Sequence, residues 1–411
     1  MTSQNRRLTM KDNQAKYPQL RFKGFTDPWE ERKLGDILSE RNDQMPETNE
    51  YPLMSFVQGK GVTPKGERYN RSFLVKDSEK KYKKTELGDF IYSSNNLETG
   101  SIGFNKTGKA VISPVYSIFK SKKSQESQFI GIMSARKDFI SKMVRFRQGV
   151  VYGQWRIHES DFLNIDMKIP NDKEQQLIIS FFENIDKTIA LHQRKLAKLK
   201  ELKQGYLQKM FPKNGSKFPQ LRFAGFADAW EERKSKEIFK AKVRKGEPNL
   251  PVLSVTQTSG VVYRGEVGID IKYDVSTLKN YKVIEPNDFV ISLRSFQGGF
   301  ELSDKLGITS PAYTIFVPKY PEEQNNLFWR IQFKRFQFIE SLKTVTFGIR
   351  DGKSISFNEF GDLKIKFPSN ILEQQKIGTF FKQLDDTIAL HQRKLDLLKE
   401  QKKGYLQKMF V

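Results

Sequence analysis

The sequence predicts an α+β protein built from two tandem mixed α/β lobes, each followed by a long helix. We expect the two helices to pack as an antiparallel coiled coil, with pseudo-two-fold symmetry between the two copies. Two observations predict this fold. The same end sequences occur twice in the 411-residue chain. Their offset of about 200 residues indicates two domain-sized copies rather than a solenoid, and each copy closes with about 40 residues of helical periodicity.

The repeated segments lie at the two ends of each copy. Eight residues from Ile189 return letter for letter from Ile388, and the seven from Gly205 return from Gly404. Near the start of each copy, Pro-Gln-Leu-Arg-Phe and Trp-Glu-Glu-Arg-Lys occur at 18–22 and 29–33, and again at 219–223 and 230–234. The middles, 40–165 and 240–360, share only a faint pattern. Identical ends indicate the same partner or the same packing used twice, and divergent middles indicate one scaffold aimed at two targets.

Short strands bounded by turn residues are expected in each lobe. We place them at 90–93, 115–119 and 165–169, and at 289–292, 312–316 and 363–367. Aligned residues persist through the divergent middles, among them Asp89 with Asp288 and the Ser-Pro pairs at 113–114 and 310–311. The two lobes should therefore share a fold, with each Ser-Pro pair forming a turn that enters a strand.

The start of each long helix is marked by a proline and a capping signal. Pro170 and Pro368 end the preceding strands. Asn171 with Glu174, and Asn370 with Glu373, have the spacing of a capping box, in which the Asn accepts a backbone N–H and the Glu reaches back. About 40 residues of helix would span roughly 60 Å.

Both helices carry a seam whose positions alternate by four and three residues, as in a coiled coil. The simplest partner for one seam is the other, and two tandem copies would place them antiparallel. The seam histidines, His192 and His391, are then residues that fix the register of the two helices, rather than ligands or acid–base groups. The seams are Ile185, Ile189, His192, Leu196, Leu199, Lys203, Tyr206 and Met210, and Leu384, Ile388, His391, Leu395, Leu398, Lys402, Tyr405 and Met409.

These signals divide the chain into six segments. A polar tail, expected to be disordered, precedes the first lobe, and a short linker joins the first helix to the second lobe. The segments are the tail 1–16, the first lobe 17–170, the first helix 171–211, the linker 212–217, the second lobe 218–368 and the second helix 369–411.

Composition narrows the class of target. The chain has no cysteine, which excludes disulfides and thiolate metal sites. No apolar run approaches the roughly 20 residues of a membrane span and no signal peptide is evident, so we expect a cytoplasmic protein. The net charge of +23, from 71 Lys and Arg against 48 Asp and Glu, favours a polyanion as partner. The alternative is a merely basic protein.

The sequence contains no recognisable catalytic or metal site. Three histidines without cysteine leave little for zinc, and neither a phosphate-binding loop nor a dinucleotide-binding glycine motif is present. The Ser-Pro pairs are similar to a methyltransferase motif but lack its second proline, and no glycine-rich turn that would hold S-adenosylmethionine is present. We therefore expect no metal and no cofactor on this chain.

Loops at matching places in the two lobes carry side chains suited to DNA. Arg can bridge guanine O6 and N7, Asn or Gln can bridge adenine N6 and N7, and Lys and Ser more often contact phosphates. Any single loop could instead be an ordinary solvated turn, but matching loops with different letters suit two readers of different sequences. The candidate DNA-binding residues are Gln58, Lys60, Lys65, Arg68, Asn70, Ser94, Asn95, Asn96, Ser101, Gln148, Tyr152, Gln154 and Arg156 in the first lobe, and Gln257, Arg264, Arg294, Ser295, Gln297, Arg350 and Lys353 in the second.

From Lys16 onward the chain resembles a specificity subunit of a type I restriction-modification system. The resemblance is carried by the Pro-Gln-Leu-Arg-Phe and Trp-Glu-Glu segments, the Glu-Gln-Gln helix starts at Glu174 and Glu373, and the twin helical tails. It implies two target-recognition domains, each reading half of a bipartite, asymmetric site in double-stranded DNA. The helices would space the lobes and dock two modification subunits. S-adenosylmethionine would bind those subunits, and ATP and Mg²⁺ would bind separate restriction subunits, which leaves this chain non-catalytic.

Two other functions remain open at this stage. One is a stand-alone methyltransferase or nuclease, and the other is a coiled-coil adaptor that binds nucleic acid without sequence preference. Four phenylalanines beside the seam suit docking of a partner protein, although they could equally pack against their own lobe. They are Phe181, Phe182, Phe380 and Phe381.

Overall fold

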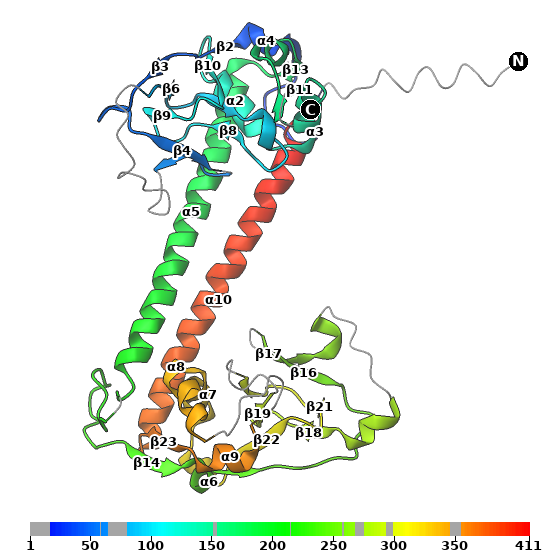
Figure 1. The fold of residues 1–411 in the computed structure, drawn as a ribbon. Coiled ribbons are helices and arrows are strands. Elements are labelled where there is room, and N and C mark those ends of the chain that lie inside the picture. Colours follow the sequence, from blue (N-terminus) through cyan, green and yellow to red (C-terminus); the bar gives the residue numbers. More distant parts are fainter. Residues whose placement is uncertain are drawn as a thin grey trace, which may run out of the picture. The chain divides into compact units, whose positions relative to one another are not determined.

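The computed structural model describes residues 17–57, 59–64, 80–150, 154–213, 215–256, 259–267, 275–292, 299–345 and 355–411, and the structural statements below concern these residues. The chain divides into two compact units. The first comprises residues up to 193 together with 394–411, and the second comprises 194–393. Each unit therefore combines one lobe, the start of the long helix that follows it, and the end of the other copy's helix (Figure 1).

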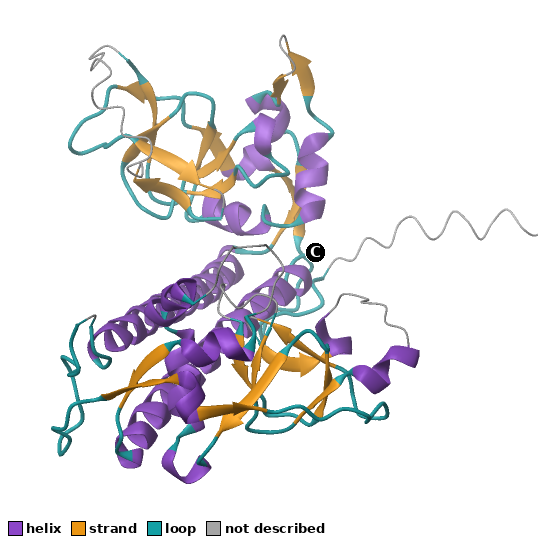
Figure 2. Cartoon of the chain, turned by 60° about the horizontal axis from the view of Figure 1, so that its bottom comes forward, coloured by secondary structure: helices purple, strands orange, loops and turns teal. Residues whose placement is uncertain are grey.

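The lobe of the first unit is built from short antiparallel strands with small helices between them (Figure 2). Its central sheet has the order β2 (Leu38–Glu40), β10 (Ser117–Ser121), β7 (Phe90–Tyr92) and β8 (Ile102–Phe104). The remaining strands form the pair β1 (Glu30–Lys33) and β13 (Asp166–Ile169), the sheet β3 (Gln44–Met45), β6 (Tyr82–Thr85) and β9 (Ala110–Ile112), and two hairpins, β4 (Met54–Val57) with β5 (Gly61–Pro64) and β11 (Gln148–Val150) with β12 (Gln154–Arg156). The helices are α1 (Leu34–Ile37), α2 (Glu126–Met133), α3 (Lys137–Val144) and α4 (Glu159–Leu163).

The lobe of the second unit repeats this topology. Its central sheet has the order β15 (Phe239–Ala241), β22 (Thr314–Pro318), β19 (Phe289–Ile291) and β20 (Phe300–Leu302). The pairs are β14 (Glu231–Lys234) with β23 (Lys364–Phe367), β16 (Leu253–Thr256) with β17 (Gly260–Tyr263), and β18 (Lys282–Ile284) with β21 (Gly307–Thr309). The helices are α6 (Ser235–Ile238), α7 (Asn326–Lys334), α8 (Phe336–Ser341) and α9 (Phe357–Asp362). The prediction of a shared fold is confirmed.

The strands predicted from the sequence are present, with ends that differ by at most two residues. The Ser-Pro pairs form the expected turns: Ser113 accepts a backbone hydrogen bond from Tyr116 (3.3 Å) and Ser310 accepts one from Tyr313 (3.1 Å). Strands β10 and β22 begin directly after these turns. The interpretation of both pairs as turns that enter strands is therefore confirmed.

The long helices are α5 (Asp172–Lys209) and α10 (Ile371–Lys408), of 38 residues each. Every predicted seam position on both helices is buried or half-buried. In the first unit the start of α5 runs antiparallel to the end of α10, because the Phe181 ring lies 4.9 Å from that of Tyr405 while Asp186 pairs with Lys402. The second unit repeats these contacts, with the Tyr206 and Phe380 rings 5.0 Å apart and Lys203 Nζ 2.5 Å from Asp385 Oδ1.

The end of each long helix completes the core of the lobe encoded by the other copy. In the first unit the Phe410 ring lies 6.2 Å from Trp29 and 5.5 Å from Phe129. In the second unit the Phe211 ring lies 5.6 Å from Trp230 and 5.9 Å from Phe328. The repeated Trp-Glu-Glu and Gly-Tyr-Leu-Gln-Lys-Met-Phe segments therefore meet in both units, and their identity reflects the same packing used twice.

A second repeated contact links the lobe to the start of its own helix. Arg21 donates two hydrogen bonds of 2.8 Å to Glu174, and Arg222 donates two of 2.7 Å to Glu373. Both glutamate side chains are 1% exposed, and their hydrogen bonds raise the pKa of each arginine. Such two-pronged pairs fix geometry because the planar guanidinium matches the carboxylate.

These pairs correct the predicted capping box. Asn171 Oδ1 accepts the backbone N–H of Glu174 (3.0 Å), as expected, and Asn370 Oδ1 accepts that of Leu372 (2.9 Å). The reciprocal half of the motif is wrong, because the Glu174 and Glu373 carboxylates are taken up by the arginines instead of returning to the cap.

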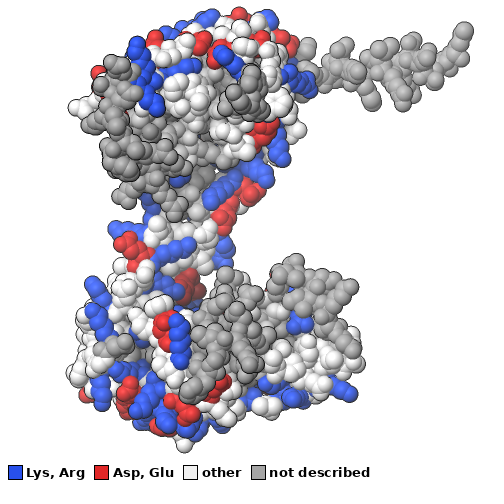
Figure 3. All heavy atoms as spheres, viewed as in Figure 1, with Lys and Arg blue, Asp and Glu red and all other residues white. Residues whose placement is uncertain are grey.

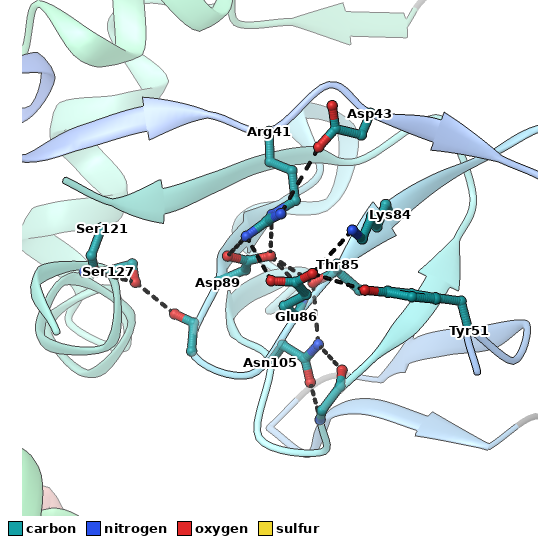
Figure 4. A network of polar contacts seen from close by, with 12 residues as sticks. Arg41, Asp43, Tyr51, Lys84, Thr85, Glu86, Asp89, Asn105, Ser121 and Ser127 are labelled. Carbon is teal, nitrogen blue, oxygen red and sulfur yellow. Dashed lines mark hydrogen bonds and ion pairs between the residues drawn. The ribbon is translucent and has the colours of Figure 1, made fainter. Parts of the chain in front are cut away.

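The aligned aspartates of the divergent middles anchor a strand turn in each lobe. Asp89 accepts a backbone hydrogen bond from Glu86 (2.7 Å) and forms an ion pair with Arg41 at 2.8 Å (Figure 4). Asp288 accepts the equivalent bond from Glu285 (2.8 Å) and pairs with Lys242. Burial raises the pKa of both aspartates. Their repetition reflects this shared structural role.

The phenylalanine prediction also needs correction. Phe182 and Phe381 are buried, in the clusters that contain Phe410 and Phe211 respectively, so they are not exposed docking positions. Phe181 and Phe380 are half-buried and pack on their own unit, with rings 5.9 Å from Phe22 and 6.0 Å from Phe223. These side chains hold each helix to its lobe.

Candidate nucleic-acid interface

In the first lobe, the points where three loops leave the core lie next to one another, around strand β8. The β4–β5 hairpin packs against β8, since Phe56 Cζ lies 3.5 Å from the position of a Cβ on Gly103. The segment leading into β8 begins where Ser93 donates its N–H to Ser101 (2.8 Å) and includes a short 3-10 helix, η2 (Ser94–Asn96). The chain returns to the core after β12 at Ile157, whose carbonyl accepts from the Tyr92 hydroxyl (3.4 Å).

In the second lobe, three loops leave the core at the same points, around β20. The β16–β17 hairpin approaches β20, because a Cβ on Gly260 would lie 3.6 Å from Glu301 Oε2. Ser292 donates its N–H to Gly299 (2.9 Å), as Ser93 does to Ser101. The chain returns to the core at Ile355, whose carbonyl accepts from the Thr314 hydroxyl (3.3 Å). One scaffold thus carries three loop positions twice, with different residues in the loops.

The structure brings together two of the loops predicted to bind DNA in the first lobe. Ser94 Oγ accepts the backbone N–H of Ile157 (3.0 Å), and Asn95 Oδ1 accepts that of Trp155 (2.6 Å). The 93–101 loop therefore supports the edge of the β11–β12 hairpin. The oxygen of Asn95 already accepts one hydrogen bond, so the two-pronged contact with adenine that the sequence suggested would use its second lone pair.

Other predicted residues of this lobe are engaged in local ion pairs or hydrogen bonds. Gln148 Nε2 donates to Asp161 (3.3 Å), and Arg156 lies 3.7 Å from Glu159. Burial alone would raise the pKa of the Glu159 carboxyl. The hydrogen bond from Ser117 and the nearby cations act more strongly in the opposite direction, so the pKa is lowered. Lys60 and Asn96 are exposed, and Ser101 is half-buried. For Gln154 the structure describes only the backbone, in β12.

In the second lobe, Arg264 begins a 3-10 helix (Arg264–Val267) directly after β17. Its Nε donates to Ser254 Oγ (3.4 Å) and its guanidinium lies 6.0 Å from the Tyr281 ring centroid. The remaining predicted residues of both lobes lie outside the described residues, and their predicted role stays a prediction. They are Gln58, Lys65, Arg68, Asn70, Tyr152, Gln257, Arg294, Ser295, Gln297, Arg350 and Lys353.

Sequence reasoning missed two features of this interface. Arg147 donates two hydrogen bonds of 2.6 Å to Glu98, and these lower the pKa of the Glu98 carboxyl. Its guanidinium also lies 6.0 Å from the ring centroid of Trp155, which is exposed and was not among the predicted contacts. A lone acidic residue in an otherwise amide-rich loop was the available signal for the first feature, and a tryptophan in a glycine-rich turn was the signal for the second.

The charge pattern is mixed rather than concentrated. On the face shown in Figure 3, Lys and Arg are spread over both lobes and the helices and alternate with Asp and Glu. Among the described residues, no group of His, Cys, Asp and Glu could hold a metal ion. No helix in the described part of the chain combines the length and apolarity that a membrane span needs.

A sequence model of the type I restriction modification DNA specificity domain matches residues 26–201 and, a second time, residues 222–400. The chain belongs to this specificity family. Each match covers one lobe and most of the helix that follows it, so the family repeat runs from the lobe of one compact unit into the other unit.

Two solved structures of specificity subunits align with most of this chain. The type-I restriction-modification system S subunit from M. genitalium aligns with a TM-score of 0.61 at 15% identity, over 96% of this chain and 99% of that one. The HsdS subunit from Thermoanaerobacter tengcongensis aligns with a TM-score of 0.44 at 14% identity, over 94% of this chain and 98% of that one. At 15% identity the likeness to the M. genitalium subunit is a likeness of fold.

Proposed function

We propose that this specificity-family chain reads a bipartite, asymmetric site in double-stranded DNA, with one half-site for each lobe. The observation that carries the proposal is the duplicated scaffold. Three loops leave the core around β8 and three again around β20, and the loop sequences differ between the two lobes. A fold that served only to coat DNA would have no use for two different sets of loops. A basic surplus of +23 supports a polyanionic target.

The long helices would space the lobes and dock two modification subunits, which would carry S-adenosylmethionine and the methyl transfer. Restriction subunits, with ATP and Mg²⁺, would join through the same complex. This chain would then contribute recognition and no catalysis.

Selection from a random duplex library tests this function. The chain is co-expressed with its modification subunits, bound to the library at physiological salt, and the retained DNA is sequenced. We expect two short, unlike motifs at a fixed spacing, and exchange of residues 40–165 should change one motif only. Retention of DNA without any enriched motif, with binding that falls equally with salt for every duplex, would support the nonspecific adaptor instead.

The docking surface is better placed on a pair of repeated leucines than on the predicted phenylalanines. Leu191 on α5 and Leu390 on α10 are 61% and 58% exposed, and neither belongs to a core cluster of the described residues. Positions four residues before and seven after them on the same helix face differ between the copies, with Lys187 against Asp386 and Lys198 against Leu397. Internal packing explains the repeated seam residues but not these leucines, whereas one partner bound twice would explain them.

We expect Leu191→Asp and Leu390→Asp each to remove one modification subunit, and the double variant to remove both. A buried charge at an interface hot spot costs about 2 kcal/mol or more, which is roughly 30-fold in affinity. Native mass spectrometry of the complex counts the subunits. Leu397→Asp is the matched control, because Leu397 is similarly exposed but has no repeated equivalent. Two bound subunits in both single variants would exclude these leucines from the interface.

A further inference from the structure

The first lobe exposes a tryptophan beside its predicted DNA-reading loops. Trp155 in β12 is 49% exposed, whereas Trp29, Trp230 and Trp329 are buried in the cores. A tryptophan in water leaves a large apolar surface uncovered, and tryptophan is the side chain most enriched where binding energy is concentrated. The exposure of this ring beside the predicted loops makes it a candidate contact.

The ring is held in place before any partner arrives. The Trp155 backbone N–H is bonded to Asn95, and its strand partner is Gly149, where an added Cβ would lie 3.9 Å from Trp155 Cζ3. The indole therefore leans across a residue that has no side chain. Arg147 borders the ring and is itself fixed by Glu98. A ring fixed in this way loses little conformational entropy on binding.

The internal repeat indicates which class of partner this ring contacts. Surfaces that serve one protein bound twice should be repeated, as Leu191 and Leu390 are. Trp155 lies in the divergent middle of the first copy, and the second copy has no tryptophan at 346–354, between the corresponding α8 and the return to the core at Ile355. A residue confined to one lobe fits the partner that differs between lobes, which under the proposed function is the DNA half-site. Its neighbours Asn95, Asn96 and Arg156 have the polar and cationic character that accompanies aromatic contacts to nucleic acid.

We infer that the exposed face of the Trp155 indole packs against a base or a deoxyribose ring of the half-site read by the first lobe. The inference rests on the proposed function and adds an apolar contact to the polar and cationic ones predicted from the sequence. In duplex DNA such a contact requires either the sugar edge of a groove or a base step opened by the wedge of the ring.

Intrinsic fluorescence can isolate this residue, because the other tryptophans are buried. Acrylamide is the quencher, since an ionic quencher would itself weaken DNA binding. In the full-length chain we expect the quenchable emission to come from Trp155, to disappear in Trp155→Phe, and to be protected by DNA that carries the first lobe's half-site. DNA in which that half-site alone is altered should give no protection.

Affinity supplies the second measurement. Trp155→Ala should raise Kd for DNA carrying the first half-site by roughly 5- to 100-fold, and Trp155→Phe by less, because an aromatic face is kept. Phe336→Ala, at an exposed ring of the second lobe, is the matched control and should leave recognition of that half-site unchanged. Unchanged emission of the buried tryptophans verifies that the Trp155→Ala variant is folded.

Three outcomes would separate the possibilities. Sequence-specific binding with Trp155 unprotected, and Trp155→Ala within about two-fold of the parent, would overturn this inference and leave the proposed function standing. Protection by modification subunits without DNA would make the ring a protein-docking residue and also overturn it. A chain that selects no sequence at all would instead contradict the proposed function.

Discussion

Replacing Arg21 with methionine is expected to lower the free energy of unfolding of the first unit by about 3–5 kcal/mol. The reason is the partner left behind, because Glu174 is 1% exposed and Arg21 donates two 2.8 Å hydrogen bonds to it. Without the guanidinium, a buried carboxylate has lost its opposite charge at the start of α5. Urea unfolding followed by hydrogen exchange of peptides from each lobe measures the loss and shows which unit bears it.

The repeat provides matched controls for this experiment. Arg222→Met should weaken the second unit by a similar amount, since Glu373 is equally buried. The double variant Arg21→Met with Glu174→Met should recover most of the loss, because replacing both members of a buried pair with apolar groups is often near neutral. Arg32→Met removes an exposed pair with Glu30 and should cost at most about 1 kcal/mol. A loss in Arg21→Met no larger than that in Arg32→Met would refute the structural role of the buried pair.

Local patterns in the sequence located the elements well because each signal is contained in a short window. The strands at 90–92 and 289–291, the Ser-Pro turns and both 38-residue helices follow from short apolar runs, turn residues and seam spacing. The capping box was wrong for the opposite reason. Glu174 chooses between its own helix start and an arginine 153 residues away, and only the tertiary structure brings that competitor near.

The candidate interface was predictable in its placement but not in its contacts. Comparison of the two copies within the one sequence locates the three loops, because they lie at matching places but differ in sequence. Which atoms remain for DNA depends on bonds among the loops themselves. The Asn95 oxygen is occupied by the Trp155 backbone, and Arg147 is occupied by Glu98, and neither pairing follows from spacing along the chain.

The repeated ends posed a choice between shared packing and a shared partner, and internal packing accounts for most but not all of the repeated residues. The Arg-Glu pairs, the tryptophans and the terminal phenylalanines meet inside each unit, so internal packing accounts for them. Leu191 and Leu390 are repeated but exposed, so they are the part of the repeat that a partner would explain. Burial thus separates the repeated residues that internal packing explains from those that only the proposed docking would explain.

The crossed packing leads to the second large effect. Phe410→Ala should destabilise the first unit by about 3–5 kcal/mol, although residue 410 is encoded at the far end of the second copy. Its ring packs in the core against Trp29 and Phe129, and removing it leaves a cavity there. Hydrogen exchange should therefore increase in peptides of the first lobe and remain unchanged in those of the second.

Phe211→Ala should give the reciprocal result, with faster exchange confined to the second lobe, where the ring packs on Trp230 and Phe328. If each phenylalanine instead protected the lobe of its own copy, the division of the chain into these two units would be wrong. The crossed result would mean that neither copy contains its complete core. Each lobe would then depend on a helix that begins in the other unit, and this linkage would keep two divergent readers on one common scaffold.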